Sequence, residues 1–283
     1  MRKPATTGTA AQTGMSLSRA YKTPAAPSTS QPISKAARKA PGDFFIGLIL
    51  AFAFLSPPLG AEDPPVNLAK LVAHRESETE VERNEYLYRQ TVTLQELDTR
   101  GAARGDYREV RDVIFSPEHE RSELALGKPE NSLKFLTLTA EDFRDIRDIQ
   151  PLVLTEDRLW NYETKLRGEE TKDQVACWVL QVRPRQILGS QRYFDGLLWV
   201  DKEGYNIVRM EGQAEPQIVS TKSENLFPRF TTIRKPVDGQ YWFPVYTYAD
   251  DALPFRSGPQ RIRLRIAYSN YRRFKVESVF KPR

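Results

Sequence analysis

Hydrophobic and polar positions alternate with a period of two over much of the second two-thirds of the chain. The pattern is clearest in residues 261–268, where Ile262, Leu264, Ile266 and Tyr268 are separated by arginines or by a small residue. Because successive side chains of a β-strand point to opposite faces of the sheet, this segment predicts a strand with one packed and one solvated face. Contact of the arginine row with an anionic headgroup or a protein partner is the alternative to a solvated outer face.

Similar runs follow one another with short turns and without long helices between them. Val237-Asp238-Gly239-Gln240 is a hairpin signal, because Asp-Gly tolerates the positive φ angles of a type I′ turn. Short turns between strands indicate antiparallel neighbours. We therefore predict a mainly β (α+β) fold with a single curved antiparallel sheet. The expected strands are residues 86–95, 107–115, 121–126, 158–164, 175–183, 192–201, 205–212, 229–234, 241–248 and 260–274.

Two segments have helical features. Between residues 64 and 84, Val66, Ala69 and Val72 form an apolar stripe at helical spacing in a polar run, which predicts an amphipathic N-terminal helix. Thr139 can cap a short inserted helix that continues to about residue 148.

The N-terminal part has the features of an export signal. Residues 44–55 form an uncharged apolar run of twelve, which is shorter than the roughly 20 residues that span a bilayer. Basic residues precede this run, and small residues ending at Ala61 follow it, as in a cleaved signal peptide. We expect a disordered basic lead-in at 1–43, a signal peptide core and cleavage site at 44–61, and one domain at 62–283. An uncleaved membrane anchor is the alternative.

Removal of the signal changes the charge of the protein. The whole chain has 42 Lys+Arg and 37 Asp+Glu, but residues 1–61 contain seven of the basic residues and one of the acids. The remaining 35 basic and 36 acidic residues give a net charge of about −1. Nucleic-acid binding, which depends on an excess of positive charge, is therefore not expected. With Cys177 as the only cysteine, the domain has no internal disulfide, and export without disulfides favours the bacterial periplasm.

The sequence contains no recognisable catalytic or metal-binding constellation. His74 and His119 are the only histidines, and their placement does not predict a metal site. No nucleophile elbow, Walker loop or dinucleotide fingerprint occurs. Cys177 lies in an apolar strand, where it is expected to behave as a small hydrophobic residue. We predict a non-enzymatic protein without cofactors or metal, and an envelope hydrolase with unrecognised carboxylates is the alternative.

The chain is rich in aromatic residues on predicted strands, among them Trp160, Trp178, Trp199 and Trp242. In a curved sheet of this size, one long helix covers only part of the concave face. The uncovered part either packs against other segments or forms an apolar pocket for an acyl chain or an apolar peptide segment. Both interpretations remain open at this point.

Three consecutive motifs resemble the outer-membrane lipoprotein-sorting (LolA/LolB-like) superfamily. They are Val-Ala-Cys-Trp-Val-Leu-Gln-Val-Arg-Pro at 175–184, Tyr-Phe-Asp-Gly-Leu-Leu-Trp-Val-Asp-Lys-Glu at 193–203 and Ile-Val-Arg-Met-Glu-Gly at 207–212. The resemblance extends over residues 67–274. It implies a half-open barrel of about eleven antiparallel strands, capped by helices, with an apolar interior. In the carriers of this superfamily that interior holds the acyl chains of lipoproteins crossing the periplasm.

Together these features predict a monomeric, membrane-proximal periplasmic protein that binds a lipid or an acylated protein, with a role in outer-membrane lipoprotein sorting. The alternative is a structural or sensory interaction domain whose cavity is filled by its own side chains. The direction in which each strand's side chains face is set by register, and a shift of one residue exchanges the two faces. The residues expected to line the cavity are Trp178, Leu180, Trp199, Ile207, Phe243, Ile262 and Leu264.

Overall fold

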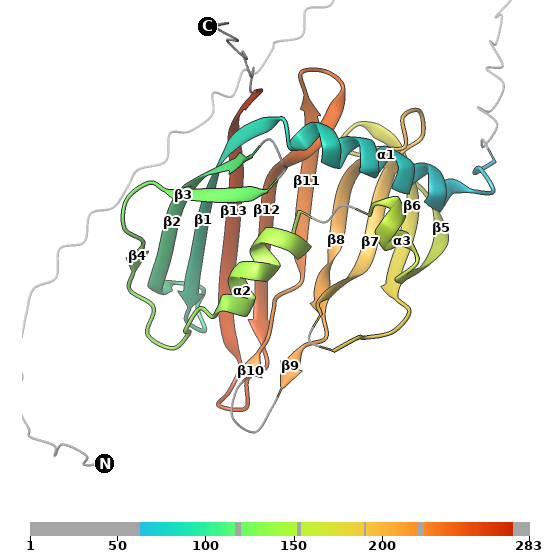
Figure 1. Ribbon diagram of the computed structural model, residues 1–283. Coiled ribbons are helices and arrows are strands. Elements are labelled where there is room, and N and C mark those ends of the chain that lie inside the picture. The colour runs from blue at the N-terminus through green and yellow to red at the C-terminus, as the bar shows by residue number, and fades with distance from the viewer. Residues whose placement is uncertain (1–62, 117–119, 152–153, 190, 220–223, 274–283) are drawn as a thin grey trace, which may run out of the picture. The chain divides into compact units, whose positions relative to one another are not determined.

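The described strands form one open antiparallel sheet of eleven strands (Figure 1). The structure is a computed structural model, and it describes residues 63–273 except 117–119, 152–153, 190 and 220–223. The strand order is β3-β2-β1-β13-β12-β11-β8-β7-β6-β5, and β4 pairs with β2 off this path. The sheet does not close into a barrel, so the predicted curved, half-open antiparallel sheet is confirmed. The predicted lead-in, the signal peptide and His119 lie outside the described residues.

The strands of the large sheet are β1 (Tyr86–Leu97), β2 (Ala103–Phe115), β3 (Arg121–Ala125), β4 (Glu130–Asn131), β5 (Tyr162–Lys172), β6 (Val175–Pro184), β7 (Tyr193–Asp201), β8 (Ile207–Glu215), β11 (Phe230–Val237), β12 (Tyr241–Leu253) and β13 (Gln260–Arg273). A separate two-stranded ribbon consists of β9 (Ile218–Val219) and β10 (Glu224–Asn225).

The sheet is a meander in which the last strand returns to the first. β13 lies between β12 and β1, and it pairs with β1 along nearly the full length of both strands. The β11–β12 hairpin turns at Asp238 and Gly239, whose φ angles are 50° and 80°. These positive angles are the ones that the Asp-Gly signal predicts. As predicted, Ile262, Leu264, Ile266 and Tyr268 are buried on β13, while its arginines lie on the outer face.

Helical segments cover one face of the sheet (Figure 1). They are α1 (Leu68–Arg83), α2 (Ala140–Arg144), the π-helical turn η1 (Asp145–Ile149) and α3 (Glu156–Leu159). The predicted N-terminal helix is therefore present, but it begins after Val66, which is fully exposed. The residues that α1 buries include Leu68, Val72 and Glu76, which are spaced four apart and so face the sheet together.

A buried ion pair fastens α1 to the sheet. One nitrogen of Arg234 on β11 donates to both carboxylate oxygens of Glu76, at 2.8 and 2.9 Å. Both side chains are only 1% exposed. Arg234 also donates to the carbonyl of Pro151 at 3.4 Å, so it connects α1 with the segment that follows η1.

The predicted strand at 158–164 is wrong in its first half. Residues Glu156–Leu159 form α3, and β5 begins only at Tyr162. Thr155 precedes this helix in extended conformation, and Glu156 and Asp157 occupy its first turn, which is a favourable start for a helix. Trp160 follows the helix and is 62% exposed, so it does not belong to the sheet.

Hydrophobic residues pack on both faces of the sheet. The main core lies on the face covered by the helices and includes residues from α1, η1 and most strands. A small cluster lies on the opposite, outer face, and its buried members are Cys177, Val179, Trp199 and Val208. No helix among the described residues is long and apolar enough to span a bilayer.

Candidate ligand-binding site

An apolar cavity of about 70 Å³ lies between the sheet and α2. Leu94 of β1 and Ile262 and Leu264 of β13 form its sheet side, and Leu138 and Ile146 belong to the segment that covers it. Pockets that enclose a whole small-molecule ligand measure about 300–1,000 Å³, so this cavity holds an acyl chain only after its cover moves. The lining residues are Leu94, Leu136, Thr137, Leu138, Thr139, Asp142, Ile146, Leu226, Phe227, Pro228, Leu253, Phe255, Ile262 and Leu264.

A buried carboxylate on β1 holds the loop that leads into this cover. Glu96 is 0% exposed and accepts hydrogen bonds from three consecutive backbone N–H groups. The distances are 2.8 Å from Lys134, 2.7 Å from Phe135 and 2.6 Å from Leu136. Hydrogen bonds to an ionised group are stronger than neutral ones, and these three fix the loop next to the cavity.

The start of α2 is fixed by a capping box. The backbone N–H of Thr139 donates to Asp142 at 2.7 Å, and the N–H of Asp142 donates to the Thr139 hydroxyl at 3.3 Å. The predicted cap at Thr139 is therefore confirmed. None of the five residues of α2 is fully buried, so α2 covers the cavity without a deep anchor of its own.

The anchor lies one turn further on, in η1. Asp145 is buried and forms an ion pair with Arg192, whose side chain is also largely buried. Burial raises the pKa of Asp145 to about 6, although Arg192 acts in the opposite direction. The cover is thus attached at both ends, by Glu96 before α2 and by Asp145 after it.

A row of polar side chains crosses five adjacent strands on the same face. Arg111, Gln90 and Tyr268 are register partners on β2, β1 and β13, and Thr247 and Thr232 are partners on β12 and β11. All five are at most 7% exposed. We call these five residues the polar row. It interrupts the apolar face between the cavity and the end of the sheet near Tyr86.

Part of the polar row is a directed chain of hydrogen bonds. Thr232 donates to the carbonyl of Gln150 at 2.7 Å, and it must therefore accept from Thr247 at 2.8 Å. Thr247 then accepts from the Tyr268 hydroxyl at 3.4 Å. Burial raises the pKa of Tyr268, which keeps this hydroxyl protonated as the donor. The chain ties the residue after η1 to three strands.

Five of the seven predicted cavity residues belong to the main core: Trp178, Leu180, Ile207, Ile262 and Leu264. Of these, Ile262 and Leu264 line the cavity, and the other three lie elsewhere in the core.

The two remaining predicted residues lie apart from the cavity. Phe243 packs against Tyr86 and Tyr271, with ring centroids 5.2 and 5.3 Å apart. Trp199 lies in the outer cluster, because it is the register partner of Val179 and therefore shares its face. Its indole N–H donates to Glu170 at 2.7 Å. The structure thus does not place Trp199 with the other six on the covered face.

The described residues include no group of three or more His, Cys, Asp or Glu side chains arranged to hold a metal ion. His74 is exposed and contacts Glu156 at 3.2 Å. Cys177 is completely buried, and burial raises the pKa of its thiol to about 11. At neutral pH this thiol is protonated and therefore a poor nucleophile.

The fold has similar solved structures. They include a DUF1329 family protein from Desulfovibrio piger, with 15% sequence identity and a TM-score of 0.37, covering 78% of this chain and 96% of that one. A LolA superfamily protein from Nitrosomonas europaea has 12% identity and a TM-score of 0.36, covering 76% and 97%. MucB of Pseudomonas aeruginosa, solved in complex with MucA, has 12% identity and a TM-score of 0.22, covering 71% and 98%.

These similarities are at most 15% in sequence identity and 0.37 in TM-score, so neither a family nor a role of this chain follows from them. No protein-family profile matches the chain, and no curated protein sequence matches it.

Several residues that shape the site were not predicted from the sequence. Gln90 and Glu96 share the parity of the apolar residues of β1, and Arg111 shares the parity of those of β2. A polar residue at a position that the pattern assigns to the core is the signal that identifies such groups.

Proposed function

We propose that this protein is a non-catalytic binding protein of the bacterial periplasm, exported by a cleaved signal peptide. Its ligand is a lipid or the acylated segment of a protein, held between the sheet and α2. The observation that carries this proposal is the apolar cavity with Ile262 and Leu264 on the sheet side and Leu138 in the cover. Burial of each CH₂ group gives about 0.8 kcal/mol, which is enough to hold an acyl chain reversibly.

Binding requires the cover to open, because the cavity measures only about 70 Å³. α2 has no fully buried residue, and the large apolar side chain that its displacement exposes is the half-buried Phe143, which packs against Tyr107. η1, which follows α2 directly, is a π-helical turn, and such irregular turns are frequent at functional sites. In this proposal, α2 and residues 137–139 swing outward, while the hydrogen bonds of Glu96 to residues 134–136 and the Asp145–Arg192 pair stay in place.

Native mass spectrometry of the protein purified from its own host tests the proposal directly. We expect co-purified lipid, or saturable binding of a fluorescent fatty acid by the protein as isolated. Leu138→Trp fills the cavity from the half-buried loop and should weaken fatty-acid binding. Leu197→Trp places the same substitution at a half-buried position of the outer face and should leave binding unchanged. The proposal is contradicted if the wild-type protein co-purifies without lipid and also shows no saturable binding of the fatty acid.

The small volume of the cavity favours one second candidate. A cavity already filled by its own side chains is what a structural or sensory interaction domain requires. Such a protein would dock a partner through its surface and would show the ligand-free result in the same experiment.

A further inference from the structure

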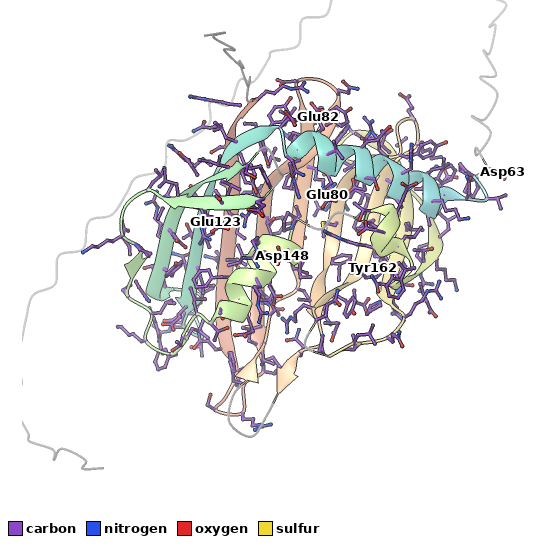
Figure 2. The ribbon with its side chains drawn as sticks, viewed as in Figure 1. Asp63, Glu80, Glu82, Glu123, Asp148 and Tyr162 are labelled. Atoms are coloured by element: carbon purple, nitrogen blue, oxygen red, sulfur yellow. The ribbon has the colours of Figure 1, made fainter. Side chains whose placement is uncertain are left out.

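A second, larger cavity lies on the other side of η1, between α1 and the β-sheet. It has a volume of about 530 Å³ and receives residues from α1, η1, α3 and several strands. Figure 2 labels three of its lining residues, Glu80 on α1, Asp148 in η1 and Tyr162 at the start of β5. We call this cavity the arginine groove. It shares no lining residue with the apolar cavity under α2.

Positive charge dominates the arginine groove. Its lining includes three carboxylates, and each of them forms an ion pair with an arginine of the same lining. Asp145 pairs with Arg192. Glu80 pairs with Arg158 at 3.3 Å, and Asp148 pairs with Arg147 at 3.0 Å. Three further arginines remain. The six arginines of the groove are Arg83, Arg121, Arg144, Arg147, Arg158 and Arg192.

Of the three remaining arginines, Arg121 pairs with Glu123, and Arg144 pairs with Glu141 at 2.8 Å. Arg83 at the end of α1 has no carboxylate partner among the residues that the structure describes. Its Nε is buried and makes no hydrogen bond there. Arg83 is therefore a charged donor that lines the groove without an acceptor.

A second donor without an acceptor lines the same groove. Tyr193 on β7 is 2% exposed, and within the described residues its hydroxyl makes no hydrogen bond. A buried hydroxyl or guanidinium N–H without a partner destabilises a folded protein, and such groups normally have one. Arginine Nε is a donor only, and a phenol O–H can donate. Two unsatisfied donors in one positively charged cavity indicate an anionic acceptor.

The remaining floor of the groove is apolar and aromatic. Tyr88, Phe115, Ile149 and Tyr162 line it, and Phe115 and Tyr162 are at most 9% exposed. A ligand in this groove therefore meets arginines together with an apolar surface. This combination matches an amphiphile better than a fully polar anion.

We propose that the arginine groove binds the phosphate group of an amphiphile through Arg83 and the hydroxyl of Tyr193. Both side chains line the same cavity, a phosphate offers several oxygens in different directions, and planar guanidinium groups match its geometry. This site is distinct from the cavity under α2 and does not depend on acyl binding there.

Isothermal titration calorimetry of the full chain with three probes tests the proposal. The probes are dodecyl phosphate below its micellar concentration, inorganic phosphate and uncharged dodecyl maltoside. In the Leu138→Trp variant, which weakens acyl binding under α2, we expect saturable, salt-sensitive binding of dodecyl phosphate and none of the maltoside. Equal affinity for inorganic phosphate would identify free phosphate as the ligand, and much weaker affinity would identify the amphiphile; both results support the phosphate site.

Two variants of the groove and one control assign the contacts. Arg83→Gln and Tyr193→Phe should each weaken dodecyl phosphate binding by about tenfold or more, the usual effect of losing a hydrogen bond to a charged group. Tyr193→Phe should not lower the melting temperature of the free protein, because the hydroxyl that it removes is unpaired. Arg265→Gln removes an exposed arginine from the outer face and should leave binding unchanged.

Absence of saturable binding by both phosphate probes overturns the proposal. So does an Arg265→Gln variant that weakens binding as much as Arg83→Gln, because the effect would then come from net charge. Fatty-acid binding and its loss in Leu138→Trp are measured in a separate experiment. A negative result for phosphate binding in the arginine groove therefore does not affect the test of acyl binding under α2, and the reverse also holds.

Discussion

The buried pair between Glu76 and Arg234 gives the sharpest prediction about stability. Both side chains are 1% exposed, and the contacts measure 2.8 and 2.9 Å. Arg234→Met leaves the Glu76 carboxylate buried without its cation. Breaking a buried pair from one side costs about 3–5 kcal/mol. For a domain of about 200 residues, each kcal/mol lowers the melting temperature by about 2–4 °C, so we expect a fall of roughly 6–20 °C.

The matched control is a more exposed ion pair with a similar contact distance. Arg263 and Asp250 also approach to 2.8 Å, but their side chains are 31% and 43% exposed. Arg263→Met should cost less than about 1 kcal/mol, because water screens and replaces such a pair. The double variant Glu76→Leu/Arg234→Met should recover much of the loss, since it removes both buried charges.

Urea unfolding followed by circular dichroism measures the free energies of five proteins: the wild type, Arg234→Met, Glu76→Leu, the double variant and Arg263→Met. The reasoning is refuted if Arg234→Met costs no more than Arg263→Met. It is also refuted if the double variant loses the sum of the two single losses, because no coupling would then exist between the two charges.

Four further outcomes follow from single side chains. Glu96→Gln should lower the free energy of unfolding in urea by about 1–3 kcal/mol, because the amide NH₂ group cannot accept the hydrogen bonds that the backbone N–H groups donate to the carboxylate. The variant should also show faster hydrogen exchange at residues 134–136, and unchanged exchange there would contradict the role of Glu96 in fixing this loop. The pKa of Asp145 is about 6 in the folded protein and 3.8 in its ordinary state, so the folded state binds more protons between these values. The stability of the wild type relative to Asp145→Asn should therefore fall by roughly 2 kcal/mol as the pH rises from 4 to 6, and parallel pH curves would exclude this. Cys177 should be inert to a thiol reagent in the folded protein and reactive in urea; rapid native labelling would show that it is not buried. Gly212→Ala should lower the free energy of unfolding by about 1–3 kcal/mol in the same assay, because its new methyl group would lie 2.5 Å from the Phe194 ring and 2.3 Å from a backbone oxygen. An unchanged free energy of unfolding would mean that the ring moves aside freely.

The sheet could be predicted from the sequence because its signals are local. Alternation on β13, the Asp-Gly turn and the Thr139 cap each depend on a few neighbouring residues, and all three were confirmed. The strand expected at 158–161 failed because a local helix start competes there with the alternating pattern.

The site could be predicted only in part, because it depends on register. The strong alternation assigned Ile262 and Leu264 to the packed face of β13, where they line the apolar cavity. In β7, by contrast, consecutive apolar residues surround Trp199, so sequence parity alone does not decide its face. The arginine groove joins Arg83 of α1 to Tyr193 of β7, which are 110 positions apart, and only the folded sheet brings them to one cavity.

The polar row also sets a limit to the length of apolar surface that an acyl chain bound under α2 would meet along β13. Ile262 at the cavity and Tyr268 in the row are six positions apart on β13, which is about 20 Å at 3.4 Å per residue. A chain that extends further must bury CH₂ groups against hydroxyls or separate Tyr268, Thr247 and Thr232 from one another. If the proposed acyl chain binds there, added length beyond this point would bring little or no gain in affinity, and the row would select ligands by chain length.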